Sequence, residues 1–148
     1  MGQGKLMRLL RSSAPEGHRP ETPRHPATRV LLVDGEPAVR VVLAQALRDQ
    51  GCVVLETDGQ ELRRQLPALA EEPVDLVISD VQTLEPLGLA ALADLRRVDW
   101  VMPILLIASD DPVETRRQAR RLQATAVLPR SVQASVLKQT VCDMIPRV

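Results

Sequence analysis

The chain contains no phenylalanine and no tyrosine, and Trp100 is the single aromatic residue among its 148. Without aromatic side chains it cannot build the stacking platforms that sites for single-stranded nucleic acid use. Its two histidines, His18 and His25, both lie near the N-terminus. The rest of the chain therefore holds neither a Ser-His-Asp triad nor a zinc site of ordinary composition. No G-x-G-x-x-G or G-x-x-x-x-G-K-S/T sequence occurs, which argues against nucleotide binding.

Cysteines, long apolar runs and excess charge are also scarce. Cys52 and Cys142 form no metal or redox motif, which is typical of free thiols in a reducing cytoplasm. No apolar run approaches the roughly 20 residues of a membrane span. Basic and acidic residues number 19 each, but residues 1–29 hold six basic and two acidic ones, which leaves 13 basic and 17 acidic residues beyond them. This mildly acidic body argues against nucleic acid as a partner.

The N-terminal part of the chain differs from the rest. Residues 12–28 contain four prolines and almost nothing apolar. Such a segment cannot offset its ordering entropy by burying apolar surface. We therefore expect residues 1–28 to be a disordered, basic, proline-rich leader and residues 29–148 to be the folded domain.

Three almost unbroken apolar runs each end at acidic residues. Residues 30–33 lead to Asp34, residues 74–79 lead to Asp80, and residues 104–108 lead to Ser109-Asp110-Asp111. Runs of Val, Ile and Leu without alternation are typical of strands that are buried on both faces, as in a parallel sheet covered by helices. Shorter strands are expected at residues 52–56 and 125–128.

Helical patterns follow each of these five strands. Pro37 opens the first helix and Gly51 closes it. Asp58 is expected to cap a helix that runs to about Glu71, and Asp111 to start another. The remaining helices are expected at residues 88–98 and 132–144. The residues predicted to face inward in the first and last helices are Val39, Val42, Leu43, Ala46 and Leu47, and Val136, Leu137, Val141 and Ile145.

Five strand–helix units favour an α/β, flavodoxin-like (βα)5 fold, a doubly wound five-stranded parallel sheet of order 2-1-3-4-5. Ligands of such sheets bind where the strand order reverses, here between the strands that end in Asp34 and Asp80. Two carboxylates there suit a magnesium ion that also takes a phosphate oxygen, and an aspartate can itself form an acyl phosphate. Arg130, just beyond strand five, is placed to neutralise phosphoryl oxygens. Spacing alone also fits aspartates that only cap loops and helices.

Several segments, in order, resemble the receiver domain of response regulators. Residues 30–40 (VLLVDGEPAVR) are similar to its opening, normally V-D-D-E-P, and residues 75–80 (DLVISD) to the strand that carries its phosphoacceptor aspartate. Residues 102–108 (MPILLIA) resemble its fourth strand, and residues 126–132 (AVLPRSV) the end of its fifth, which usually has Lys-Pro in place of Arg130-Ser131. Gly88 falls where the family has a loop glycine. The resemblance covers about residues 29–145.

The resemblance implies a role for each matching residue. Asp80 is expected to accept the phosphoryl group, Asp34 and Asp80 to hold Mg²⁺, and Arg130 to replace the lysine that contacts the phosphoryl group. The chain departs from the family pattern at Gly35, which occupies a second acidic position, so we expect magnesium to bind weakly. Ala108 stands where the family has a hydroxyl side chain, and Val127 replaces an aromatic residue that takes part in switching.

The function that the resemblance implies is a stand-alone receiver domain in a cytoplasmic two-component phosphorelay, not an enzyme. Its partners would be a histidine kinase or phosphotransfer protein and a downstream protein target, with self-association as a further route, and the outer face of the last two helices is the expected contact surface. No membrane span or nucleic-acid partner is expected. One alternative is a pseudo-receiver, a protein-interaction module that works without phosphate. Another is an unrelated α/β protein that binds a small ligand.

Overall fold

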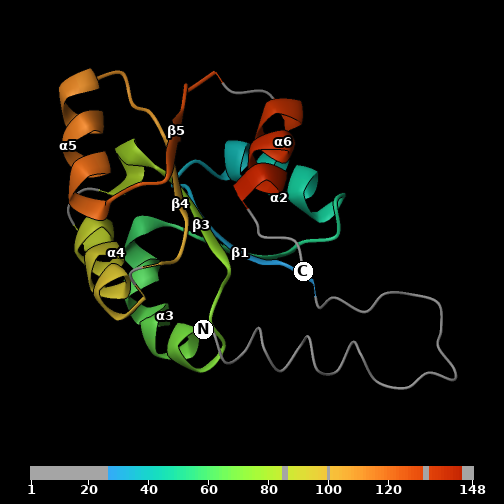
Figure 1. Cartoon of the computed structure of the whole chain (residues 1–148), viewed down its shortest axis with the longest axis horizontal. Coiled ribbons are helices and arrows are strands. Elements are labelled where there is room, and N and C mark those ends of the chain that lie inside the picture. The colour runs from blue at the N-terminus through green and yellow to red at the C-terminus, as the bar shows by residue number, and fades with distance from the viewer. Residues whose placement is uncertain (1–26, 85–86, 100, 132–133, 145–148) are drawn as a thin grey trace, which may run out of the picture.

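The computed structural model describes residues 27–84, 87–99, 101–131 and 134–144, along which strands and helices alternate (Figure 1). The strands are β1 (Arg29–Val33), β2 (Val53–Thr57), β3 (Leu76–Asp80), β4 (Ile104–Ile107) and β5 (Ala126–Leu128). Neighbouring strands pair in parallel in the order β2-β1-β3-β4-β5. This confirms the predicted fold class and strand order. Residues 1–26 of the predicted leader, with Trp100 and Ile145, lie outside the described residues.

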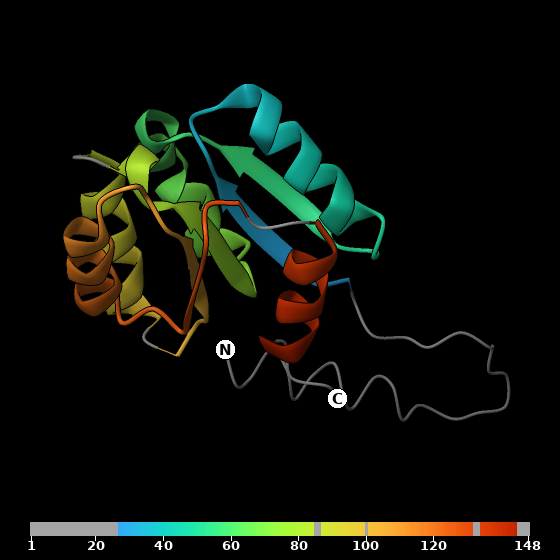
Figure 2. The same cartoon turned by 90° about the horizontal axis from the view of Figure 1, so that it is seen from above.

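The helices lie in two layers, one on each face of the sheet. They are α2 (Pro37–Arg48), α3 (Gly59–Glu71), α4 (Leu87–Val98), α5 (Pro112–Leu122), α6 (Ala134–Met144) and the short 3-10 helix η1 (Val81–Leu84). Figures 1 and 2 show α2 and α6 together over one face and α3, α4 and α5 over the other. In the described part of the chain, no helix has the length and apolarity that a membrane span requires.

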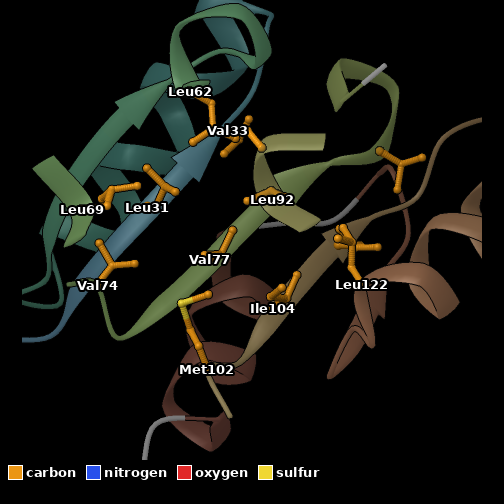
Figure 3. Packing of buried hydrophobic residues seen from close by; sticks show 13 residues of the cluster. Leu31, Val33, Leu62, Leu69, Val74, Val77, Leu92, Met102, Ile104 and Leu122 are labelled. Carbon is orange, nitrogen blue, oxygen red and sulfur yellow. The ribbon is translucent and has the colours of Figure 1, made fainter. Parts of the chain in front are cut away.

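Each strand contributes side chains to both layers because successive residues of a strand point to opposite faces. In β1, Leu31 and Val33 pack under α3 and α4, whereas Val30 and Leu32 pack under α2 and α6. Figure 3 shows the first of these two clusters, which extends along one face of the sheet from Leu62 past Val77 and Leu92 to Ile104 and Leu122. Burial on both faces explains why the strands read as continuous apolar runs.

The predicted helix ends are confirmed at three places. The Asp58 carboxylate accepts the backbone N–H groups of Gln60 and Glu61 at 2.9 and 2.7 Å, so it caps α3. The carboxylate of Asp111 accepts two backbone N–H groups at the start of α5 in the same way. After α2, Gly51 adopts a φ of 91°, a left-handed conformation that suits glycine at a helix end.

The predicted inner face of α2 is partly wrong. Leu43, Ala46 and Leu47 are buried as predicted, but Val39 and Val42 are 40% and 61% exposed. Ala44 is buried instead, and the Arg40 side chain lies on the same side. Arg40 turns inward, where it binds the Asp34 carbonyl after β1 and the Glu56 carboxylate of β2. In α6, Leu137 and Val141 are buried as predicted, but Val136 is 45% exposed at the edge of that stripe.

One arginine is built into the core. Arg96 of α4 is 8% exposed and donates to four backbone carbonyl groups. Its Nε binds Leu122 O at 2.9 Å, its Nη2 binds Gln123 O at 3.1 Å, and its Nη1 binds Met102 O at 2.6 Å and Asp99 O at 3.3 Å. Burial lowers the pKa of Arg96 from its ordinary value, and the Asp99 carboxylate opposes this shift. The guanidinium thereby ties the ends of α4 and α5 to the segment that leads into β4.

We predict that Arg96→Met lowers the free energy of unfolding by about 2–4 kcal/mol, because a buried acceptor left unpaired costs about 1–3 kcal/mol. The matched control is Arg97→Met, the next residue, which is exposed and pairs with Asp94. That change should stay within about 0.5 kcal/mol. Urea unfolding followed by circular dichroism measures both variants. Equal losses would show that the four carbonyl bonds of Arg96 add nothing to stability.

Candidate functional site

The strand register brings Asp34 and Asp80 to neighbouring positions at one edge of the sheet. Val33 of β1 is aligned with Ser79 of β3, so the next residue of each chain segment is an aspartate. Neighbouring strands lie about 4.8 Å apart. The negative charge of Asp80 is one of the causes that raise the pKa of Asp34, as expected for two carboxylates that lie close together.

Asp34 is held in place by backbone hydrogen bonds on both sides. Its N–H donates to Thr57 O at 3.0 Å, and its Oδ1 accepts the Glu36 N–H at 2.9 Å. The residue is 4% exposed. Burial raises the pKa of Asp34, the Glu36 N–H lowers it, and the charges of Asp80 and Glu36 raise it further. The net shift is upward, so the charged form of this carboxylate is disfavoured in the folded chain.

Arg40 is a neighbour of the site that sequence reasoning missed. Its Nη1 donates to the Asp34 carbonyl oxygen at 2.6 Å, and its Nε lies 3.3 Å from Glu56 Oε1. Glu56 also pairs with Arg48 at 2.9 Å. The Arg40 charge lowers the pKa of Asp34 and so partly offsets the effect of burial. The signal in the sequence is an arginine three residues before Leu43, on the apolar stripe of α2.

Asp80 ends β3 and is half-buried, so its carboxylate lies at the rim of the sheet. Its Oδ1 accepts the Gln82 N–H at a long 3.4 Å, at the start of η1. A carboxylate in this position is reachable from solvent. It is also next to the buried Asp34 and to the start of η1.

Arg130 lies beyond β5 and contacts η1 and the segment after β4 at this edge. Its Nη1 donates to Gln82 Oε1 at 2.6 Å and to Asp110 Oδ2 at 3.2 Å. The side chain of Arg130 is 44% exposed. The predicted site residues Asp34, Asp80 and Arg130 thus share one edge. Gln82 connects Asp80 with Arg130, because its backbone N–H donates to Asp80 and its side-chain oxygen accepts from Arg130.

The departures from the family pattern have visible structural correlates. Gly35 is exposed and brings no carboxylate to the site. Ser109, next to Ala108, is engaged elsewhere, because its hydroxyl accepts the Asp111 N–H at 3.1 Å and lies 3.2 Å from Thr115 Oγ1. The Ser109 hydroxyl thus interacts with residues at the start of α5. Val127 of β5 is 42% exposed.

Asp34 and Asp80 bring two carboxylate groups to this edge, which would be a reduced ligand set for a magnesium ion. Within the described residues, no group of three or more His, Cys, Asp or Glu side chains is placed to hold a metal ion. Magnesium needs only one or two protein carboxylates, because it keeps several waters and takes phosphate oxygens as further ligands. A cation beside Asp34 would also offset the burial and the repulsion that raise its pKa.

The two cysteines take no part in this site. Both are half-buried, and the Gln50 side chain approaches Cys142 Sγ at 3.6 Å near the turn that precedes Cys52. Burial raises the pKa of the Cys52 thiol, and Cys142 adds a smaller effect in the same direction. The residues are distant in sequence but influence each other in the fold.

A sequence profile of the response regulator receiver domain matches residues 30–142. The transcriptional regulatory protein GlrR of Escherichia coli K12 is 28% identical over 123 residues, which are 82% of this chain and 27% of that protein. The probable transcriptional regulatory protein TcrX of Mycobacterium tuberculosis is 35% identical over 88 residues, 59% of this chain and 36% of that protein. The chain therefore spans about a quarter to a third of the length of these relatives.

Solved structures show the same fold. The chemotaxis protein CheY4 of Vibrio cholerae has a TM-score of 0.69 at 24% identity, covering 81% of this chain and all 100% of its own. A CheY-like receiver domain protein from Methanospirillum hungatei JF-1 also has a TM-score of 0.69, at 18% identity, covering 80% of this chain and 93% of its own.

We predict that Asp34→Asn stabilises the fold in magnesium-free buffer at neutral pH. The folded pKa of Asp34 is raised above its ordinary 3.8, so its contribution to stability is full below that value and is lost as pH rises through the folded pKa. The free energy of unfolding of the variant should therefore rise relative to that of the wild type as the pH increases from about 4 through the folded pKa of Asp34. Urea midpoints across this range measure the gain. Asp143→Asn, in α6, controls for the change in net charge, and an equal gain there would contradict the prediction.

Proposed function

Because this chain belongs to the response regulator receiver family, we propose that it accepts a phosphoryl group on Asp80 in two-component signalling. The observation that carries the proposal is the pairing of Asp34 and Asp80 at the carboxyl edge of the sheet, with Arg130 at the same edge. Two aspartates that only capped loops would not need to lie side by side, with Asp34 buried and Asp80 half-buried. The family consists of signalling modules that interact with kinases and with downstream targets.

In the proposed reaction a carboxylate oxygen of Asp80 attacks the phosphorus of the donor. A P–O bond forms, and the bond from phosphorus to the donor breaks, so that an acyl phosphate is left on the protein. With acetyl phosphate the leaving group departs as acetate, and with a phosphohistidine donor it departs as imidazole, which takes up a proton. Arg130 supplies a cation for the phosphoryl oxygens, in the role of the family lysine.

Receiver domains typically bind Mg²⁺ at this site, and here Asp34 and Asp80 would hold it. When bound, the ion neutralises charge on the phosphoryl oxygens. Asp34 is set for this by its two backbone hydrogen bonds, which fix the carboxylate before any ligand arrives. Because Gly35 contributes no third carboxylate, the proposed site binds magnesium weakly.

A pseudo-receiver is the second candidate, and specific observations favour it. The Ser109 hydroxyl is bound to groups at the start of α5, while Ala108 and Val127 cannot supply the hydroxyl and the aromatic ring that usually respond to phosphate. In that case the chain binds its partner without a phosphorylation signal. Partner contact would still use exposed surfaces such as α5, where Arg116, Arg117, Arg120 and Arg121 all face solvent.

We predict that incubation with acetyl phosphate and magnesium adds one phosphoryl group to the wild-type protein. Asp80→Asn should show none, since its amide is not a nucleophile of comparable strength. Intact-mass spectrometry gives the result, and circular dichroism verifies that both proteins are folded. An unmodified, folded wild type would reject the phosphoacceptor role and favour the pseudo-receiver. A modified Asp80→Asn would place the phosphate on another residue.

We also predict that Gly35→Asp tightens magnesium binding, on the order of tenfold, because ligand charge governs the affinity of oxygen sites for hard cations. Isothermal titration calorimetry measures the affinity. Gly35→Asn is the matched control, since it adds a similar side chain without the charge and should change the affinity much less. If Gly35→Asp leaves the affinity unchanged, Asp34 and Asp80 do not form the magnesium site.

A further inference from the structure

Arg130 connects three segments that meet at the carboxyl edge of the sheet. It follows β5, its partner Gln82 follows β3, and its partner Asp110 follows β4. A single nitrogen, Nη1, makes both contacts, at 2.6 Å to Gln82 and at 3.2 Å to Asp110. The guanidinium that would serve a phosphoryl group is thus already bound to a carboxylate and an amide oxygen.

The Asp110 carboxylate interacts with Arg130 at this edge and contributes little to the stability of the fold. Its side chain is 88% exposed, so it contributes little to packing. The adjacent residue, Asp111, is the one that caps α5, and its carboxylate accepts Val113 N–H at 3.0 Å. Removing the Asp110 charge therefore leaves the helix cap and the core in place.

We propose that Asp110 is a positioning residue. Its ion pair holds Arg130, and it competes for Arg130 with a phosphoryl group on Asp80. This inference rests on the proposed phosphoacceptor function. A guanidinium carries five N–H donors and binds phosphate oxygens in a bidentate manner, so a phosphoryl group is the stronger acceptor. Uptake of phosphate then draws Arg130 from Asp110.

The Arg130–Asp110 ion pair would also let phosphorylation of Asp80 affect α5 without the missing hydroxyl and aromatic side chains. Asp110 directly precedes Asp111, the N-cap of α5, so its release from Arg130 removes a restraint on the segment between β4 and α5. The position of that loop is otherwise set by the contacts of Ser109 with Asp111 and Thr115. The ion pair of Arg130 with Asp110 is therefore the link that the phosphoryl group would break.

The test compares the rate of phosphoryl uptake from acetyl phosphate and magnesium in four variants of the full chain. We expect Asp110→Asn to speed uptake about two- to fivefold, the range that an exposed ion pair permits. Asp94→Asn, which removes a carboxylate paired with Arg97 in α4, should match the wild type. In an Arg130→Gln background, Asp110→Asn should change the rate much less, because no guanidinium remains to be released.

Each outcome decides between the two proposals. If the wild type takes up phosphate and Asp110→Asn does so at the same rate, the positioning role is overturned while the phosphoacceptor role stands. An equal gain with and without Arg130 shows that Asp110 acts only by repelling the anionic donor, which also overturns it. A faster rate in Asp110→Asn that is absent in the Arg130→Gln background supports it. If no variant takes up phosphate, the phosphoacceptor role fails and this inference falls with it.

Discussion

Parallel pairing of strands that are buried on both faces is the constraint on which this structure depends. All five strands run the same way, so their carboxyl ends emerge at one edge, where polar groups can meet without entering the core. The alignment of Val33 with Ser79 then makes Asp34 and Asp80 neighbours. A slip of one residue in this register would turn every side chain of β3 to the opposite face, which the two apolar clusters do not permit.

Much of the fold could be predicted from the sequence because its signals are local. Continuous apolar runs indicated the buried strands, and Asp58 and Asp111 marked two helix starts by residue type and position. The inner face of α2 was mispredicted at Val39 and Val42 because periodicity treats an arginine as an outward residue. Arg40 points inward for partners that lie elsewhere in the chain, the Asp34 carbonyl and Glu56. Such partners become visible only once β1 and β2 are side by side.

The position of the candidate site could be predicted from the sequence, but its side-chain contacts could not. Strand order alone brings Asp34 and Asp80 together, and the resemblance to the receiver family is confirmed, whereas the roles of Asp34, Asp80 and Arg130 stay predictions. The partners of Arg130 could not be foreseen, since Gln82 lies in the short helix η1 and both Asp110 and Arg130 lie outside the helices and strands, where no periodic pattern places side chains. The upward pKa shift of Asp34 likewise follows from burial and from the neighbouring charge, both of which are properties of the folded chain.

At the opposite edge of the sheet, Arg96 holds the backbone through several buried hydrogen bonds. Its four carbonyl partners come from the end of α5 and from the segment between α4 and β4, and they share one buried guanidinium. Releasing any of them leaves a buried charge short of acceptors, so this corner opens as a single cooperative unit or stays closed. At the carboxyl edge, by contrast, Arg130 is half-exposed and its partners can exchange. The sheet thus has a buried guanidinium with four backbone acceptors at one end and a half-exposed guanidinium with two side-chain acceptors at the other. A ligand at the acidic edge can therefore displace the contacts of Arg130 without breaking those of Arg96.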